Sequence, residues 1–250
     1  MNPDYQFRLP TFLSYSFLAV IVSIVVAVGS LYVLGDYKVA SYGVAILVLS
    51  IGFAYVGICS TVKNYTNLEK RLDDRDLLLS KIPWKGSESI LDIGCGNGIL
   101  LLSAAKLIPD GKAIGIDLWT ENSGDNKKEI FLKNAEIEGV KDRVLLQTAD
   151  ARMLPYEDGS INVILCGLTM HHILHDTGAE KAVREMVRVV RQEGYVAVYD
   201  VPIAIYSTFK LLVKEGIEVT KINSRIIIGK KAANNSLQPT PKSNAAELLR

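Results

Sequence analysis

The sequence predicts an α/β protein with a mostly parallel sheet, preceded by an apolar segment that spans a membrane. Three observations predict this. From residue 88 onward, short apolar runs alternate with longer amphipathic stretches; two short runs near the C-terminus follow one another directly; and residues 9–35 and 39–62 carry no charge. Alternating strands and helices favour parallel βαβ units with right-handed crossovers, whereas a two-residue link between strands favours an antiparallel hairpin.

The two uncharged stretches are each longer than the roughly 20 residues that cross a bilayer as a helix. Only residues 35–38 separate them, so we expect a tight helical hairpin with both ends on one side. A cleaved signal peptide would have a shorter apolar region and a basic start. The loop offers Lys38 alone, whereas the flanks offer more basic residues, namely Arg8, Lys63, Lys70, Arg71 and Arg75. Since basic residues stay inside, we expect a multi-pass membrane protein with both termini and the α/β domain in the cytoplasm.

The rest of the chain divides into a linker, a domain and a tail. We expect residues 1–62 to form the two-helix hairpin, 63–87 a linker helix whose mixed charges suit lipid headgroups, 88–231 the α/β domain and 232–250 a disordered tail without an apolar face. Five strands are expected before the C-terminal hairpin, over residues 89–93, 112–118, 143–148, 161–166 and 195–201. Helices are expected over 99–108 and 127–138, and a third is expected to start at a capping box from Thr177 to Glu180 and to end at Gly194. The hairpin strands are expected at 218–222 and 225–228.

Charge and cysteine content narrow the function classes. The formal net charge is +1, which argues against a partner held by phosphate neutralisation, so we expect no nucleic acid. The three cysteines are odd in number and scattered, and they indicate neither a disulfide framework nor a metal knuckle. Free thiols fit a reducing, cytosol-facing compartment.

The most informative segment is a glycine loop between the first strand and the first helix of the domain. Its pattern is Asp92-x-Gly94-x-Gly96-x-Gly98. Glycine suits a sharp turn and close approach of backbone to a ligand, and a helix start offers free N–H groups to a carboxylate or phosphate. A dinucleotide loop would need a small third residue at position 99, which is Ile99. The pattern closely resembles the first motif of class I S-adenosylmethionine-dependent methyltransferases.

This resemblance extends from about residue 88 to residue 230, with its motifs in the family's order. It implies a Rossmann-like sheet of seven strands, mostly parallel, with one antiparallel strand, and S-adenosyl-L-methionine as cofactor. It makes Asp117 the partner of the ribose diol, although NAD sites use the same device, and Asp150 the partner of the adenine amino group. The residues that the resemblance places around the cofactor are Asp92, Gly94, Cys95, Gly96, Gly98, Asp117, Leu118, Asp150, Ala151 and Cys166.

The three histidines lie together after the expected fourth strand, at His171, His172 and His175, with Asp176 beside them. The segment Leu165 to Ile173 resembles small-molecule members of the family, including quinone- and sterol-type enzymes, which place histidine here without metal. We therefore expect no metal site. His171 and His172 are the candidate catalytic residues, either of which could act as a general base, and packing against the cofactor pocket is the alternative.

These observations predict transfer of a methyl group to a small molecule. The Asn-Pro-Pro-aromatic or Asp-Pro-Pro-aromatic segment of amino-nitrogen methyltransferases is replaced by residues 166–169, which favours an oxygen, carbon or sulfur acceptor. The membrane hairpin suggests contact with membrane lipid and an acceptor dissolved in the bilayer; it could instead localise an enzyme acting on a soluble metabolite, or dock a partner. Two rivals stay open: a non-catalytic cofactor-binding membrane protein, and an NAD-dependent oxidoreductase.

Overall fold

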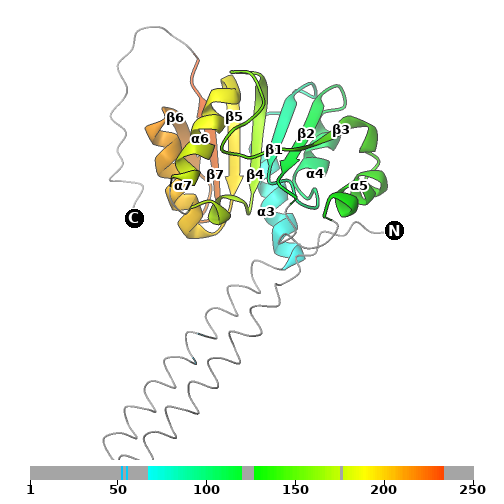
Figure 1. Cartoon of the computed structure of the whole chain (residues 1–250), viewed down its shortest axis with the longest axis horizontal. Coiled ribbons are helices and arrows are strands. Elements are labelled where there is room, and N and C mark those ends of the chain that lie inside the picture. Colours follow the sequence, from blue (N-terminus) through cyan, green and yellow to red (C-terminus); the bar gives the residue numbers. More distant parts are fainter. Residues whose placement is uncertain (1–51, 53–54, 56–66, 120–126, 175–176, 234–250) are drawn as a thin grey trace, which may run out of the picture.

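The computed structural model describes residues 52, 55, 67–119, 127–174 and 177–233 (Figure 1). The predicted membrane hairpin and the predicted C-terminal tail lie outside these residues, apart from Gly52, Tyr55, Ala232 and Ala233. Within the described ranges, no helix has both the length and the apolar character that a membrane crossing requires.

The domain is built on one seven-stranded sheet in the order β3-β2-β1-β4-β5-β7-β6. Strand β7 is antiparallel to both of its neighbours, β5 and β6, while the pairs among β1 to β5 are parallel. The predicted seven-stranded, mostly parallel sheet with one antiparallel strand is therefore confirmed. The strands are β1 (Ser89–Ile93), β2 (Lys112–Asp117), β3 (Val144–Thr148), β4 (Ile161–Gly167), β5 (Val190–Tyr199), β6 (Ile217–Lys221) and β7 (Ile226–Lys231).

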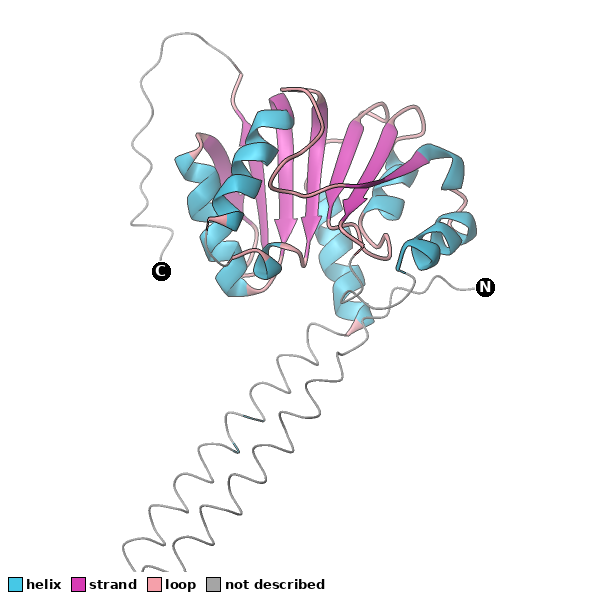
Figure 2. Ribbon diagram, in the orientation of Figure 1, coloured by secondary structure: helices cyan, strands magenta, loops and turns pink. Residues whose placement is uncertain are grey.

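Helices cover both faces of this sheet, because its central strands are apolar on both sides (Figure 2). One core packs Leu78, Leu101 and Phe131 against the sheet, from α3 (Leu68–Ser80), α4 (Leu101–Leu107) and α5 (Lys127–Ile137). The other packs Val183 and Leu212 against it, from α6 (Gly178–Val189) and α7 (Pro202–Lys214).

The structure corrects three details of the predicted elements. Helix α6 ends at Val189, and the strand after it starts at Val190 and contains Gly194, because a register irregularity against β4 between Ile161 and Val163 extends the pairing. The expected capping box does not form, since the Thr177 side chain makes no cap hydrogen bond and Glu180 pairs with Arg184 and Lys214. Helix α7 was not predicted.

Helix α3 packs against the sheet as part of the domain (Figure 1). Two of the charged residues that were expected to suit lipid headgroups, Arg71 and Asp74, are buried. That expectation is wrong for these two, because they lie on the helix face turned toward β5 and β7, where Asp74 meets Arg225. The neighbouring Asp73 is exposed.

Candidate functional site

The glycine loop leaves β1 at the centre of the sheet, between β2 and β4. Gly94, Gly96 and Gly98 all have positive φ, at 69°, 49° and 90°, a region that other residues enter at a cost. A Cβ atom on Gly98 would lie 2.8 Å from Leu102 and 2.9 Å from Phe131, so only glycine fits there. The loop lies at the carboxyl ends of the parallel strands, between β2 and β4, where the order of the strands along the sheet reverses. Ligands usually bind at this point of such a sheet.

Asp92 is buried just before this loop, with 2% of its surface exposed. It accepts a hydrogen bond from the backbone of Leu101 at the start of α4, while its Oδ1 atom has no partner in the described part of the chain. Burial raises the pKa of Asp92 well above its ordinary value, and the nearby Asp117 adds to the rise. A buried acceptor with a free oxygen beside the glycine loop suits a cationic or N–H-bearing ligand.

Asp117 ends β2 and holds the glycine loop directly. Its Oδ2 accepts from the backbone N–H of Gly96 at 3.1 Å, and its Oδ1 accepts from that of Trp119 at 3.3 Å. A carboxylate has about four lone-pair sites, so the group can still accept from a diol. Leu118 is about half exposed beside it, and Trp119 has the left-handed φ of 50°.

Asp150 follows β3 and is tied to its own turn. Arg152 donates to both of its oxygens, with contacts from 2.5 to 3.0 Å, and the backbone N–H of Arg152 donates at 2.9 Å. These bonds lower the pKa of Asp150. Asp150 therefore caps its own turn, and Ala151 is half-buried against the second core.

The segment after β4 lies directly against the glycine loop. The Thr169 hydroxyl lies 3.2 Å from the carbonyl of Ile93 and 3.1 Å from that of Gly167, to either of which it can donate. A Cβ atom on Gly94 would lie 2.2 Å from Thr169 Oγ1. The structure thus brings together two motifs that are more than 70 residues apart, a contact that sequence reasoning missed.

His171 is held by an acid that the sequence analysis did not single out. Its Nδ1 lies 2.7 Å from Asp200 Oδ1, and its backbone N–H donates to Asp200 Oδ2 at 3.2 Å. Asp200 is fully buried and also accepts from the N–H of Val201 at 2.7 Å. The available signal was its place after β5, which matches that of Asp117 at the end of β2. His172 is exposed, and its ring lies 3.9 Å from that of His171.

The two cysteines predicted near the cofactor are buried. Cys95 belongs to the first core, and its Sγ would lie 2.8 Å from a Cβ atom on Gly115, so its thiol faces the sheet. Cys166 belongs to the second core. Burial raises the pKa of both thiols well above the ordinary value. Both thiols are therefore in surroundings that disfavour the nucleophilic thiolate. Among the described residues no metal-binding cluster of His, Cys, Asp or Glu is found; His175 and Asp176 lie outside them.

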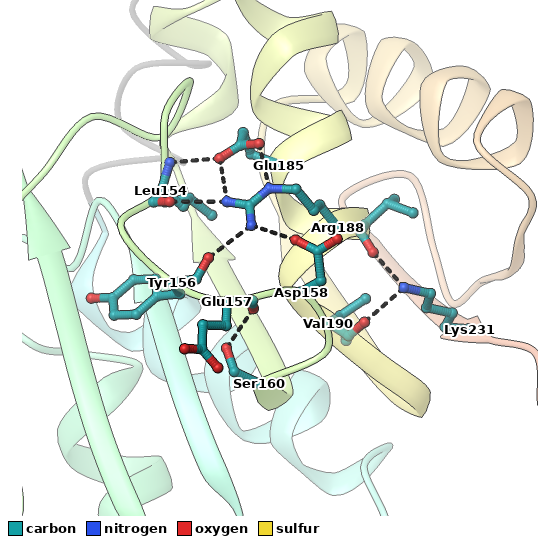
Figure 3. Close-up of polar contacts among 10 residues, drawn as sticks. Leu154, Tyr156, Glu157, Asp158, Ser160, Glu185, Arg188, Val190 and Lys231 are labelled. Carbon is teal, nitrogen blue, oxygen red and sulfur yellow. Dashed lines mark hydrogen bonds and ion pairs between the residues drawn. The ribbon is translucent and has the colours of Figure 1, made fainter.

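Arg188 on α6 fixes the segment between β3 and β4 (Figure 3). Its guanidinium donates to the carbonyls of Leu154 and Tyr156 at 2.9 and 2.7 Å, and to Asp158 at 2.8 Å. Glu185 accepts from it twice and also accepts from the N–H of Leu154. The segment that follows Asp150 is therefore anchored to α6, and Tyr156 is placed to donate to Gln147 at 2.9 Å.

The loop, the two acids and the strand-end histidine fit S-adenosylmethionine. Asp92 offers an unpaired buried oxygen, Asp117 offers a carboxylate at the usual ribose position, and the glycines leave no side chains between backbone and ligand. The fold and site define the class of a Rossmann-like domain that binds this nucleoside cofactor.

Comparison with known proteins agrees with this class. Residues 91–198 match the family model described as a methyltransferase domain. The demethylmenaquinone methyltransferase of Lactobacillus johnsonii is 28% identical over 129 residues, covering 50% of this chain and 49% of that protein. The chain thus spans about half the length of this relative.

Two solved structures show the same fold. A SAM-dependent methyltransferase from Aquifex aeolicus has a TM-score of 0.53 at 20% identity, covering 68% of this chain and 96% of that protein. The cyclase SpnF has a TM-score of 0.55 at 18% identity, covering 66% and 83%. At these identities the likeness shows the fold alone.

Proposed function

We propose that this protein transfers a methyl group from S-adenosylmethionine to a small-molecule acceptor. The observation that carries the proposal is the glycine loop pinned by Asp117, with the buried and half-paired Asp92 beneath it. The cofactor, when bound, supplies an electrophilic methyl group and a good leaving group. The chain's own residues bind and orient the reactants and handle any proton that the acceptor loses.

His171 is the residue that we propose for this proton. The Asp200 carboxylate accepts from Nδ1, which leaves the lone pair on Nε2. Asp200 is buried and holds the histidine at two points, its ring and its backbone. An acceptor with an O–H group would lose its proton to Nε2 as the bond from oxygen to the methyl carbon forms and the bond from that carbon to sulfur breaks. The pair therefore favours an oxygen acceptor over one that carries no ionisable proton.

We further propose that the acceptor is lipophilic and that the chain is anchored in a membrane by residues 1–62, with the domain and both termini in the cytoplasm. The support is the two uncharged stretches and the distribution of basic residues in the sequence. One relative is named for demethylmenaquinone. Helix α3 starts at Leu68, close after the second stretch, so the domain would stay near the bilayer.

The rival functions predict different ligands. An NAD-dependent oxidoreductase would bind NAD, and a non-catalytic module would bind S-adenosylhomocysteine without turnover. Calorimetry of the full chain with S-adenosylhomocysteine and with NAD distinguishes the oxidoreductase from the other two, and transfer of label from S-adenosylmethionine distinguishes the enzyme from the non-catalytic module. Binding of NAD alone would overturn the methyltransferase proposal.

The acceptor is tested with radiolabelled S-adenosylmethionine and whole membranes, followed by extraction with organic solvent. We expect label to enter the organic phase with wild type, and to enter it far more slowly with His171→Ala. Label confined to an aqueous small molecule would reject the lipophilic acceptor and leave methyl transfer standing.

A further inference from the structure

Helix α3 carries two buried charged residues on one face. Arg71 and Asp74 are three residues apart and so share a face, and each is less than 10% exposed. A buried charge is costly unless it is paired. The groups that pair with Arg71 and Asp74 therefore indicate which part of the domain helix α3 holds in place.

Asp74 reaches the turn between β6 and β7. Its Oδ2 lies 2.8 Å from Arg225 Nη2, with both side chains almost wholly buried. The two side chains form an ion pair, but the atoms are not aligned as a hydrogen bond. Burial raises the pKa of Asp74, and the charge of Arg225 works against that rise. The carbonyl of Arg225 in turn accepts from the backbone N–H of Asp200 at 2.9 Å.

Arg71 reaches the end of β5. Its side chain is hydrogen-bonded to Tyr199, the buried residue that directly precedes Asp200. The Tyr199 ring lies against Gly167, where a Cβ atom would be 2.4 Å from it, and its carbonyl accepts from the N–H of Leu168 at 2.9 Å. Leu168 is held at a φ of 52°, in the chain segment that leads to His171. Such strained residues persist where their surroundings hold them.

We propose that Arg71 and Asp74 are positioning residues for the reaction: through Tyr199 and Arg225 they fix the two backbone points from which Asp200 orients His171. The inference rests on the proposed role of His171 in methyl transfer. It assigns α3 to the acceptor side of the site, while the glycine loop and Asp117 hold the cofactor independently.

The test compares Asp74→Asn with Asp73→Asn, which makes the same change of charge on an exposed neighbour. Nitrogen-15 chemical shifts of the His171 ring, assigned with a His171→Gln variant because His172 and His175 are nearby, show which ring nitrogen carries the proton. Calorimetry with S-adenosylhomocysteine measures the cofactor site, and kcat is measured with the membrane extract. The ring shifts and the calorimetry need no turnover, so they separate failure of this proposal from failure of the proposed function.

We expect Asp74→Asn to move the His171 ring shifts and to lower kcat by about 3- to 10-fold, the scale of coupling through a packed network. The affinity for S-adenosylhomocysteine should stay within about twofold, and Asp73→Asn should match wild type. If Asp74→Asn does not fold, Asp74→Glu takes its place, since it keeps the charge but displaces the carboxylate, and it is expected to move the His171 ring shifts away from their wild-type values. The proposal would be overturned if a folded Asp74→Asn variant kept the wild-type ring shifts of His171. It would also be overturned if the variant lost affinity for S-adenosylhomocysteine by the same factor as it lost kcat, because Arg71 and Asp74 would then only stabilise the fold.

Discussion

Asp117 accepts a hydrogen bond from the backbone N–H of Gly96 at 3.1 Å, across 21 residues of sequence. The carboxylate expected to bind the ribose therefore also fixes the shape of the glycine loop. A single substitution at this position should act on the ligand contact and on the loop together. Replacing Asp117 should therefore weaken ligand binding more than replacing a residue that has only one of these functions.

Replacing Asp117 with alanine should weaken binding of S-adenosylhomocysteine by ~1–3 kcal/mol, the scale of lost hydrogen bonds to a charged group. Calorimetry of the full chain measures this, with Asp110→Asn on the exposed turn before β2 as control. Wild-type affinity in the Asp117→Ala variant would show that the ribose lies elsewhere.

Replacing Asp92 with asparagine should stabilise the ligand-free domain at neutral pH by about 1–2 kcal/mol, because a buried, half-paired carboxylate is removed. Burial raises the pKa of Asp92 well above 3.8 in the folded state. The folded state thus holds this proton more tightly than the unfolded chain, so the stability that this proton contributes is present at low pH. It is lost as the pH rises from about 4 through the raised pKa.

This pH dependence is measurable by denaturant unfolding at pH 5 and pH 8. The two tryptophans, Trp84 and Trp119, both lie in the domain, so their fluorescence reports on it. The Asp92→Asn variant should lose part of the wild-type difference between the two pH values and should bind S-adenosylhomocysteine more weakly. A variant that is less stable than wild type at pH 8 would show that the Asp92 carboxylate is itself stabilising.

Replacing His171 with alanine should lower kcat by roughly 100-fold or more, the usual scale for a general base, with little change in cofactor affinity. Replacing His172 should cost less, because Asp200 contacts His171 and His172 is exposed. Steady-state rates on the membrane extract and calorimetry give the two quantities. Equal losses in both variants would contradict the assignment of the base to His171.

Replacing Arg188 with lysine should destabilise the domain by about 2 kcal/mol. Lysine cannot reproduce the fork that reaches Leu154, Tyr156 and Glu185 at once. Arg184→Lys is the matched control on the same helix, since Arg184 forms exposed pairs that should be worth under about 1 kcal/mol. Equal unfolding midpoints for the two variants would show that the Arg188 contacts add nothing.

The order of the elements and the cofactor loop could be predicted because their signals are local. The spacing of Gly94, Gly96 and Gly98 reflects a local backbone requirement, since all three have positive φ in the structure. The short apolar runs are likewise a local signal, because a strand that is covered on both faces is apolar along its whole length. Helix α7 was missed because Pro202 and a nearly continuous apolar stretch resemble a loop and a strand as much as a helix.

The sequence by itself determined the parallel sheet, its single antiparallel strand and the class of cofactor, since each depends on residues that are close together in the chain. Only the tertiary structure decided which acid serves which group. Asp74 and Asp200 carry no distinguishing pattern in the sequence, yet one pairs with Arg225 and the other holds His171. Asp92 belongs to the glycine motif, but only the structure shows that it lies half-paired under the loop. The physical reason is that burial and long-range pairing set the role of a carboxylate, and both arise only when distant strand ends meet.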